Sequence, residues 1–315
     1  MKDGAISAVR YADGTLRGSP GTADLAWWSV TKLALAAAAL VLARAGRIDL
    51  DAAVEGAGGA SLRALLGHRG RIANYSDLAD YRADVARGGV PWPPEEMLAR
   101  VAALPRPAAW AYSNTGYYLV RRAIERAADA PIGRALDELV LSPLGIADAR
   151  IAGRPEEMAA LALPAPDYDP AWVYHGCLVG PAASAARLVG GILAGPILSP
   201  EARAAMRTVS PVPDAGPPWV TAGYGLGLMT GRIGDGVRVG EARVGGARVL
   251  AVEGHSGGGP GSGCAVYRFA DLPGTPTVAV FAPDGACEAR AGALAVEAAE
   301  AWSRRAGLRA PPGCE

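Results

Sequence analysis

Apolar and polar positions alternate loosely at the start of the chain and then give way to a long apolar stretch. Residues 5 to 19 show this alternation and contain Asp13-Gly14, a typical hairpin turn, so they predict a first pair of strands. Residues 29 to 45 are rich in Ala and Leu, are apolar nearly all round and stop near Gly46. They predict a helix that lies at the centre of the fold rather than on its surface.

The middle of the chain has helical periodicity interrupted by proline and glycine, and its last third returns to strands. Helices are predicted over residues 61–66, 94–103, 115–128 and 132–141. Short strands separated by glycines and turns are predicted over residues 237–244, 248–253, 264–269 and 277–282, with a closing helix over 288–305. Strands at both ends with helices between them favour an α/β (α+β) fold, in which both termini build one sheet and a helical region is inserted in it.

The length of 315 residues allows one domain to hold a second as an insertion. We predict that residues 1–50 and 170–315 form an α/β domain around the sheet, and that residues 51–169 form an all-helical domain. Half of the residues are hydrophobic and 20% are charged, which is typical of a globular chain that can bury a large core.

The charges of the chain balance, with 31 Lys and Arg residues against 31 Asp and Glu residues. Proteins that bind nucleic acids usually carry a basic excess, so no nucleic-acid partner is expected. The longest apolar run, residues 33–43, is too short to span a bilayer, and no membrane association is expected. Residues 1–4 do not begin a secretory signal, which favours a cytoplasmic location. No pattern in the sequence indicates an oligomeric state.

The cysteines are widely and unevenly spaced and form no Cys-x-x-Cys pair; they are Cys177, Cys264, Cys287 and Cys314. This spacing indicates neither a metal site nor a disulfide framework. It favours reduced thiols that are mostly buried.

The first chemical element is Ser29 followed three residues later by Lys32. Residues three apart lie on the same face of a helix, so the lysine amine can lie beside the serine hydroxyl. A serine needs an adjacent base to act as a nucleophile, and burial favours the neutral form of a lysine, which can be that base. Arginine does not lose its proton in proteins, and this arginine-rich chain has lysine only at Lys2 and Lys32. The alternative is a helix-end lysine whose amine merely reaches solvent.

The second element is Tyr112 with Asn114. A phenol can relay a proton between attacking and leaving groups, and an amide can bind a substrate carbonyl or hold the lysine in place. A local competitor is Tyr75, in the Asn-Tyr-Ser-Asp sequence of residues 74–77. Tyr112 is preferred because the helix predicted over residues 115–128 follows it and would fix its loop.

The third element is His255 with Gly257, inside the glycine-rich run of residues 254–263. Glycines let a substrate backbone approach closely, and a strand edge offers the N–H groups that an oxyanion hole needs. The alternative for this run is a tight hairpin. The ordered combination of the three elements indicates a catalytic set more strongly than any one of them alone.

Together these elements resemble the serine β-lactamase and penicillin-binding-protein-like superfamily, and within it the branch of class C β-lactamases, D-aminopeptidases and family VIII esterases. The similar segments are residues 28–32 (Trp-Ser-Val-Thr-Lys), 47–51 (the helix exit), 62–68 (Leu-Leu-x-His), 110–117 (the Tyr-Ser-Asn loop), and 224–227 and 254–261 (the C-terminal strands). The resemblance covers most of the chain. It implies an antiparallel sheet flanked by helices, an inserted all-helical domain and a cleft between them.

The resemblance also implies roles for individual residues. It implies an acyl-enzyme on Ser29, with Lys32 and Tyr112 as proton-transfer groups. Substrate would be bound by Asn114. No metal and no organic cofactor is implied.

Further substrate contacts are implied for the third element. The oxyanion hole would consist of the backbone N–H groups of Ser29 and Gly258, with Gly257 and His255 beside the substrate. His255 stands where β-lactamases and D,D-peptidases carry lysine, and histidine is largely neutral near pH 7. An anchor for a substrate carboxylate is therefore weaker here, which favours ester, amide or amino-terminal substrates.

The sequence thus predicts a serine hydrolase, an esterase or amidase, for small ester, amide or peptide substrates, including substrates with D-amino acids. A β-lactamase or D,D-peptidase is the alternative, and a non-catalytic relative that binds a ligand in the same cleft is a third possibility. His68 and His175 are isolated in the sequence and are predicted to be structural, because metal sites need more convergent ligands.

Overall fold

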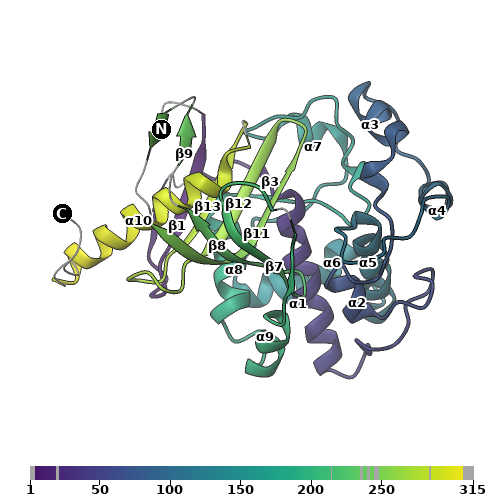
Figure 1. Cartoon of the computed structure of the whole chain (residues 1–315), viewed down its shortest axis with the longest axis horizontal. Helices are drawn as coiled ribbons and strands as arrows, with labels where there is room; N and C mark the ends of the chain where they lie inside the picture. Colours follow the sequence, from purple (N-terminus) through teal and green to yellow (C-terminus); the bar gives the residue numbers. More distant parts are fainter. Residues whose placement is uncertain are drawn as a thin grey trace.

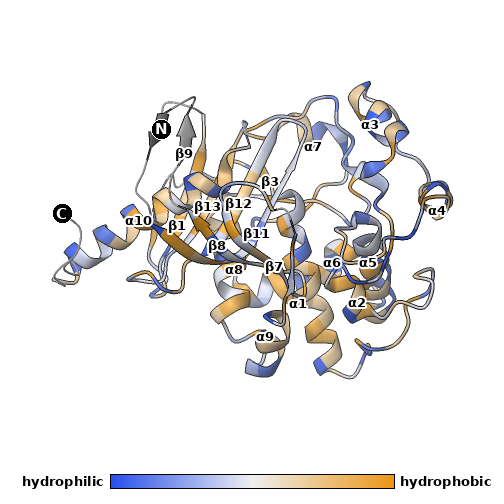
Figure 2. Cartoon of the chain, in the orientation of Figure 1, coloured by the Kyte–Doolittle hydropathy of each residue, from blue (hydrophilic) through white to orange (hydrophobic). Residues whose placement is uncertain are grey.

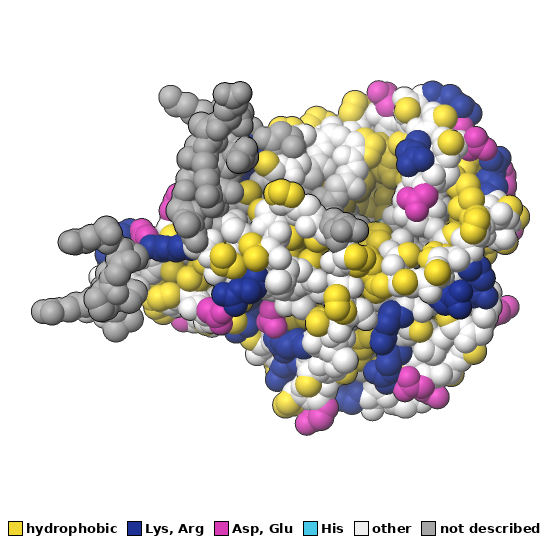
Figure 3. Space-filling view, viewed as in Figure 1, with side chains coloured by type: hydrophobic (Ala, Val, Ile, Leu, Met, Phe, Trp, Pro, Cys, Tyr) yellow, Lys and Arg dark blue, Asp and Glu magenta, His cyan; other side chains and the backbone are white. Residues whose placement is uncertain are grey.

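The computed structural model describes residues 4–18, 21–213, 215–234, 237–239, 242–244, 248–283 and 285–307. A sheet-containing part and a helical part lie side by side, with the long helix α1 (Thr31–Arg44) between them (Figure 1). On the face drawn in Figure 3, hydrophobic side chains gather in the middle, and basic and acidic side chains are interspersed around the edge.

The main sheet has eight antiparallel strands. In spatial order they are β2 (Leu16–Gly18), β1 (Ile6–Arg10), β13 (Thr277–Ala282), β12 (Ser262–Arg268), β11 (Val249–Gly259), β8 (Met229–Gly234), β7 (Trp219–Tyr224) and β6 (Ser210–Pro211). Its first and last strands in the sequence, β1 and β13, are neighbours within it. Strand β1 pairs with β13, with Ala8 opposite Ala279. The pairing with β13 thus fixes the position of the N-terminal hairpin, β1 and β2, in the sheet.

Both faces of this sheet are covered by helices, as its alternating side chains require. In β13, Val278 and Val280 pack with helix α10 (Cys287–Arg305), whereas Ala279 and Phe281 belong to the core shared with α1 and α8 (Ala182–Ala194). Successive strand residues point to opposite faces, so a strand with a helix layer on each side is apolar at every position. All six residues of β13 are buried.

Smaller sheets lie outside the main one. A three-stranded antiparallel sheet has β5 (Leu178–Gly180) between β3 (Leu25–Ala26) and β4 (Arg150–Ile151). The strand predicted over residues 237–244 is two short strands, β9 (Val237–Val239) and β10 (Ala242–Val244), which pair with each other.

The remaining helices are mostly short. They are α2 (Leu62–Leu66), α3 (Ala79–Ala86), α4 (Pro94–Ala102), α5 (Asn114–Ala128), α6 (Ile132–Leu136), α7 (Pro155–Ala159) and α9 (Pro200–Met206). Helices α2 to α6 lie in the helical part, and α9 lies near α8 below the main sheet (Figure 1). Single turns are η1 (Trp28–Val30), η2 (Tyr75–Asp77), the π-helical η3 (Asp137–Leu141), η4 (Ser142–Leu144) and η5 (Pro170–Trp172).

Helix α1 is the buried axis of the molecule. Its residues 31 to 40 are all buried, and Figure 2 shows the helix as almost continuously hydrophobic. The polar exceptions in this stretch are Thr31 and Lys32, at its first turn. A polar side chain is costly in such a place unless it is hydrogen-bonded, so these two residues mark the end of α1 as special.

The fold class predicted from the sequence is confirmed, as are the N-terminal strand pair and the central helix. The third element differs from the prediction in one respect. Strand β11 continues into the glycine-rich run as far as Gly259, whereas the sequence predicted strand only as far as residue 253. Residues 260–261 then form the tight hairpin turn that was the alternative for this run, and β12 follows. The domain boundaries at residues 50 and 170 remain a proposal. Within the part of the chain that the structure describes, no helix combines the length and apolar character needed to cross a membrane.

Candidate active site

Ser29 and Lys32 lie where the single turn η1 leads into α1. Their spacing places both side chains on one face, and Lys32 Nζ lies 2.9 Å from Ser29 Oγ. The turn is held to strand β5 by a hydrogen bond of 2.8 Å from the Trp27 N–H to the Leu178 carbonyl. Ser29 is partly exposed, whereas Lys32 is fully buried. A hydroxyl that solvent can reach therefore contacts an amine that solvent cannot reach.

The Lys32 amine is surrounded by uncharged groups. Nζ donates to Asn114 Oδ1 at 2.7 Å, lies 3.1 Å from His175 Nε2 and lies 4.9 Å from the centre of the Tyr112 ring. Among the described residues, no carboxylate forms an ion pair with it. Burial lowers the pKa of Lys32 well below its usual value. The neutral amine that a general base requires is therefore populated at a lower pH than in an exposed lysine.

Tyr112 ends the loop that leads into α5. Burial raises the pKa of its hydroxyl, and the neighbouring Ser29 side chain has a smaller, opposing effect. Ser113 fixes the loop, because its N–H donates to His68 Nδ1 at 3.1 Å and its Oγ caps α5 by accepting from the Gly116 N–H at 3.0 Å. Tyr112 is thus a protonated phenol at neutral pH, beside the serine.

Asn114, the first residue of α5, is held by residues 74–76. This segment contains Tyr75, which the sequence offered as an alternative to Tyr112. Asn114 Nδ2 donates to Ser76 Oγ at 3.3 Å, and its backbone N–H donates to Asn74 Oδ1 at 3.0 Å. Tyr75 is buried, and its N–H donates to Thr115 Oγ1 at 3.0 Å. The structure places Tyr112 rather than Tyr75 against the serine, and residues 74–76 support Asn114.

His255 lies on β11 and is buried. Its Nε2 is 2.9 Å from the Tyr224 hydroxyl. Burial, and secondly the charge of Lys32, lowers the pKa of His255 to about 3. The side chain is therefore neutral at ordinary pH, so this position offers no fixed cation to a substrate carboxylate.

Strand β11 approaches the serine most closely at Gly257. A Cβ atom at this position would lie 2.5 Å from the backbone nitrogen of Ser29 and 2.9 Å from Trp28 Cβ, and a Cβ at Gly259 would lie 2.5 Å from the Trp28 ring. Glycine is needed at both positions because any side chain would displace the turn that carries Ser29. Gly258, between them, is exposed along the strand.

Both histidines that were predicted to be structural lie at the site. His175 contacts the Lys32 amine, and the His68 ring lies 4.2 Å from the Tyr112 ring and 4.4 Å from the Tyr224 ring between centres. Burial lowers the pKa of both, so both are neutral. Among the described residues, His68 Nε2 and His175 Nδ1 have no hydrogen-bond partner. No spacing signal could have found His175, because 143 positions separate it from Lys32.

A cavity of about 300 Å³ opens beside Tyr112. Its lining is largely apolar, with Ile72, Leu104 and Pro107 among its residues, and Asp77 is its one charged lining residue. Asp77 is exposed, and its Oδ1 accepts a hydrogen bond from Asn74 Nδ2 at 3.3 Å. A substrate group that projects past Tyr112 would therefore meet apolar walls and a carboxylate.

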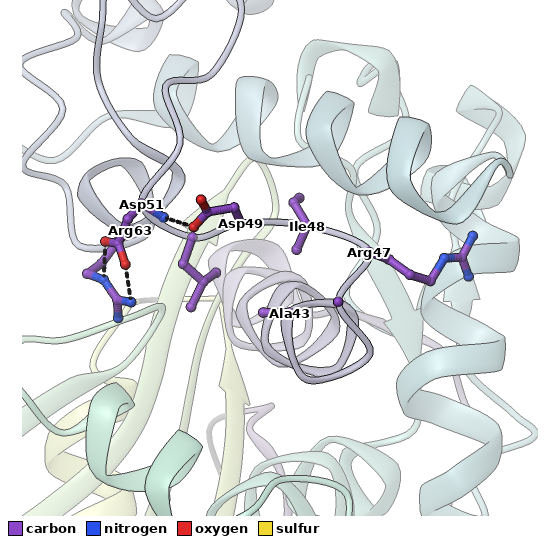
Figure 4. Close-up of a pocket in the computed structure, with 8 residues that line it drawn as sticks. Ala43, Arg47, Ile48, Asp49, Asp51 and Arg63 are labelled. Atoms are coloured by element: carbon purple, nitrogen blue, oxygen red, sulfur yellow. Dashed lines mark hydrogen bonds and ion pairs between the residues drawn. The ribbon is translucent and has the colours of Figure 1, made fainter.

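A second hollow, of about 460 Å³, lies at the opposite end of α1. Figure 4 shows that it contains the ion pair between Arg63 and Asp51 (2.7 Å), with Asp49 and Arg47 nearby. Helix α1 has 14 residues and so is about 20 Å long, which separates this hollow from Ser29. It has no part in the arrangement around the serine.

The sequence profile of the family described as Beta-lactamase matches residues 20–282, so this chain belongs to that family. It is a hydrolase of the serine β-lactamase and penicillin-binding-protein-like superfamily. A comparison with curated protein sequences finds no match.

Solved structures of several enzymes share the fold. A D-stereospecific amidohydrolase from Streptomyces sp. is 23% identical, with a TM-score of 0.71, and the match covers 89% of this chain and 88% of that one. The D-amino acid amidase from Ochrobactrum anthropi SV3, complexed with L-phenylalanine amide, is 18% identical, with a TM-score of 0.72 and coverage of 95% and 94%. The octameric penicillin-binding protein homologue from Pyrococcus abyssi is 19% identical, with a TM-score of 0.68 and coverage of 97% and 74%.

Replacement of Lys32 by methionine is expected to raise stability near neutral pH. The folded-state pKa lies below the usual value of 10.5, so the unfolded chain binds the proton more readily and wild-type stability falls as the pH falls from about 10.5 toward the folded pKa. Methionine removes this effect, and each kcal/mol relieved should raise Tm by about 2–4 °C. Thermal unfolding at pH 7 and pH 9.5 should show a gain that shrinks at the higher pH. An equal gain at both values would contradict the burial of a titrating amine.

Replacement of Gly257 by alanine is expected to reduce activity because the new Cβ would press on the Ser29 backbone. Overpacking of this kind costs about 1–3 kcal/mol, and a displacement of about 1 Å at a nucleophile can lower the rate roughly 100-fold. Gly216→Ala is the matched control, because a Cβ there meets nothing within 4 Å. The rate of Ser29 acylation should fall in the first variant alone, and equal rates in both would contradict the close approach.

Proposed function

We propose that this protein is a serine hydrolase that cleaves esters or amides through an acyl-enzyme on Ser29. The observation that supports this most directly is the 2.9 Å contact between Ser29 Oγ and a buried Lys32 amine without a carboxylate partner among the described residues. An amine in an ion pair would remain protonated, whereas this one can accept the proton of the serine.

Acylation would begin when Lys32 takes the hydroxyl proton and Ser29 Oγ attacks the substrate carbonyl carbon. The carbonyl oxygen becomes an oxyanion, for which we propose the backbone N–H groups of Ser29 and Gly258 as donors. Tyr112 would transfer a proton to the leaving alcohol or amine and regain one from Lys32, and collapse of the intermediate breaks the carbonyl–heteroatom bond. Water then attacks the ester on Ser29 with the same groups acting in reverse, which releases the acid.

The substrate class that we propose is an amide or ester of an amino acid, with D-amino acids included. His255 is neutral, so the position opposite the serine favours an uncharged group over a carboxylate. Asp77, at the edge of the cavity beside Tyr112, would attract a free ammonium group. Structural neighbours named as a D-stereospecific amidohydrolase and a D-amino acid amidase agree with this choice.

The central experiment is labelling with a fluorophosphonate probe followed by intact-protein mass spectrometry. The wild type should gain one adduct on Ser29, Ser29→Ala should gain none, and Lys32→Met should react about three orders of magnitude more slowly. The absence of labelling in folded wild type would favour a ligand-binding relative without catalysis.

Substrate class is tested by incubation with short-chain esters, D- and L-amino acid amides and a chromogenic cephalosporin. Turnover of the esters or D-amino acid amides is expected. Efficient turnover of the cephalosporin alone would favour a β-lactamase, and a stable adduct with it alone would favour a D,D-peptidase.

Replacement of Asp77 by asparagine is expected to raise KM for substrates with a free amino group by up to about fivefold, because Asp77 is exposed and an exposed charge pair contributes about 0.2–1 kcal/mol. Substrates with an acetylated amino group should be unaffected. The control is Asp271→Asn, which removes an exposed carboxylate from the sheet-containing part. If both variants behave alike, or if both substrate types respond equally, Asp77 does not bind the ammonium group.

A further inference from the structure

Lys32 Nζ has a polar neighbour, His175, that none of the three sequence elements contains. Ser29 Oγ, Asn114 Oδ1 and His175 Nε2 lie 2.9, 2.7 and 3.1 Å from it. A neutral amine has two N–H bonds and one lone pair. If two of the neighbours accept the N–H bonds, the lone pair has a single remaining direction, toward the third neighbour.

Asn114 Oδ1 can only accept a hydrogen bond, whereas the role of His175 Nε2 depends on the tautomer of the ring. In the Nδ1–H tautomer, Nε2 accepts an N–H of Lys32, and the lone pair is left for the hydroxyl of Ser29. In the Nε2–H tautomer, the imidazole donates to the lone pair and so removes the base from the serine.

The protonated state of Lys32 distinguishes the two tautomers as well. After it takes the serine proton, the ammonium group has three N–H bonds and needs three acceptors. An Nε2–H group would then face an N–H of the ammonium at 3.1 Å. The Nδ1–H tautomer suits both protonation states of Lys32 without rearrangement, which is the property expected of a preorganised site. It also places a proton on Nδ1, which has no hydrogen-bond partner among the described residues, and the Lys32 contact at Nε2 offsets this cost.

His175 is held rigidly enough to impose a direction. The preceding carbonyl, that of Tyr174, accepts from Arg121 Nη1 at 3.1 Å, and the Tyr174 hydroxyl donates to the Trp92 carbonyl at 2.9 Å. Gly176 follows with a φ of +92°, a conformation that favours glycine. The His175 side chain is itself 2% exposed, so no bulk water competes for its contact with the amine.

We propose that His175 is a positioning residue that, as the Nδ1–H tautomer, accepts one N–H of Lys32 and thereby aims the amine's lone pair at Ser29. The inference rests on the proposed function, because it assigns Lys32 as the base. It adds a third anchor to the amine, besides the serine and Asn114.

The tautomer can be observed without any substrate. The chain has three histidines, so ¹⁵N-histidine labelling gives few signals, and those of His175 are the set lost in His175→Gln. Long-range ¹H–¹⁵N spectra between pH 6 and pH 9 should show protonated Nδ1 and unprotonated Nε2 for His175. Protonation at Nε2 would overturn the proposal, whatever the outcome of the labelling experiments.

The kinetic test compares three variants by their rate of Ser29 labelling with the fluorophosphonate probe. His175→Gln places an amide oxygen near the position of Nε2 and should label within about fivefold of wild type. His175→Leu removes the acceptor, and His175→Asn keeps a polar group only near the position of Nδ1. Both should label about 10- to 100-fold more slowly, in line with the loss of an oriented general base. Thermal unfolding of each variant establishes that the labelled protein is folded.

The pH dependence of the labelling rate distinguishes two effects that His175 could have on Lys32. One is orientation of the lone pair, and the other is a shift of the lysine pKa. The titratable groups that face Lys32 are Tyr112, Tyr117, Cys177 and His175, with His68 and His255 further away. If His175 aims the lone pair, the deficit of His175→Leu persists on the alkaline plateau, where Lys32 is neutral. Recovery to the wild-type rate at high pH, or wild-type rates in His175→Leu at all pH values, would overturn the proposal. An unlabelled wild type would instead contradict the proposed function.

Discussion

Burial of the Lys32 amine among uncharged partners is the constraint on which the rest of the site depends. An ammonium group loses several kcal/mol of hydration when it is buried, and here no carboxylate among the described residues offsets that loss. Burial therefore shifts the balance toward the neutral amine, which in the proposed mechanism accepts the proton of Ser29. A carboxylate beside Lys32 would favour the protonated amine and so remove the base. The site thus gives up stability in exchange for a group that can bind a proton.

The architecture supplies this environment from segments that are far apart in the chain. Helix α1 carries the amine into the core because its residues 33–43 are all apolar. Strand β11 closes over the serine with glycines, and the start of α5 brings Asn114 to the amine. Strand β5 holds the turn before α1, and the segment that leads to β5 carries His175. Each of these segments is fixed by hydrogen bonds of its own, so the polar groups keep their directions after water is excluded.

Local patterns in the sequence were sufficient to predict the parts of this site that lie within one turn or one loop. Ser29 and Lys32 follow from helical spacing, and Tyr112 and Asn114 from a loop ahead of a helix. The support of Asn114 by Asn74 and Ser76 could not be predicted in this way, because it depends on how two loops 40 positions apart pack together. The contact of His175 with Lys32 depends likewise on tertiary packing.

The extent of β11 shows a second limit of prediction from the sequence. Glycine weakens a strand, so the run of residues 254–263 was open to interpretation as a hairpin. In the structure the run contains both features: β11 continues to Gly259, residues 260–261 form a tight turn, and β12 begins at Ser262, so the hairpin is present. Gly257 and Gly259 lie against Ser29 and Trp28 at distances that no side chain allows. The turn could therefore be predicted from local residue preferences, whereas the length of the strand ahead of it depends on the packing of that strand against the turn that carries Ser29.

The neutrality of the three histidines gives the acylation step a simple charge balance. His68, His175 and His255 all have lowered pKa values, so at neutral pH none adds a fixed charge to the site. When the proton passes from Ser29 to Lys32 and the oxyanion forms, one positive and one negative charge appear close together. In a site of low effective dielectric constant this compact pair is favourable, and a permanent second cation nearby would oppose protonation of the lysine. A neutral histidine at position 255 is therefore compatible with the proposed role of Lys32 as a base whose charge is only transient, and it agrees with the proposed preference for substrates without a carboxylate at this position.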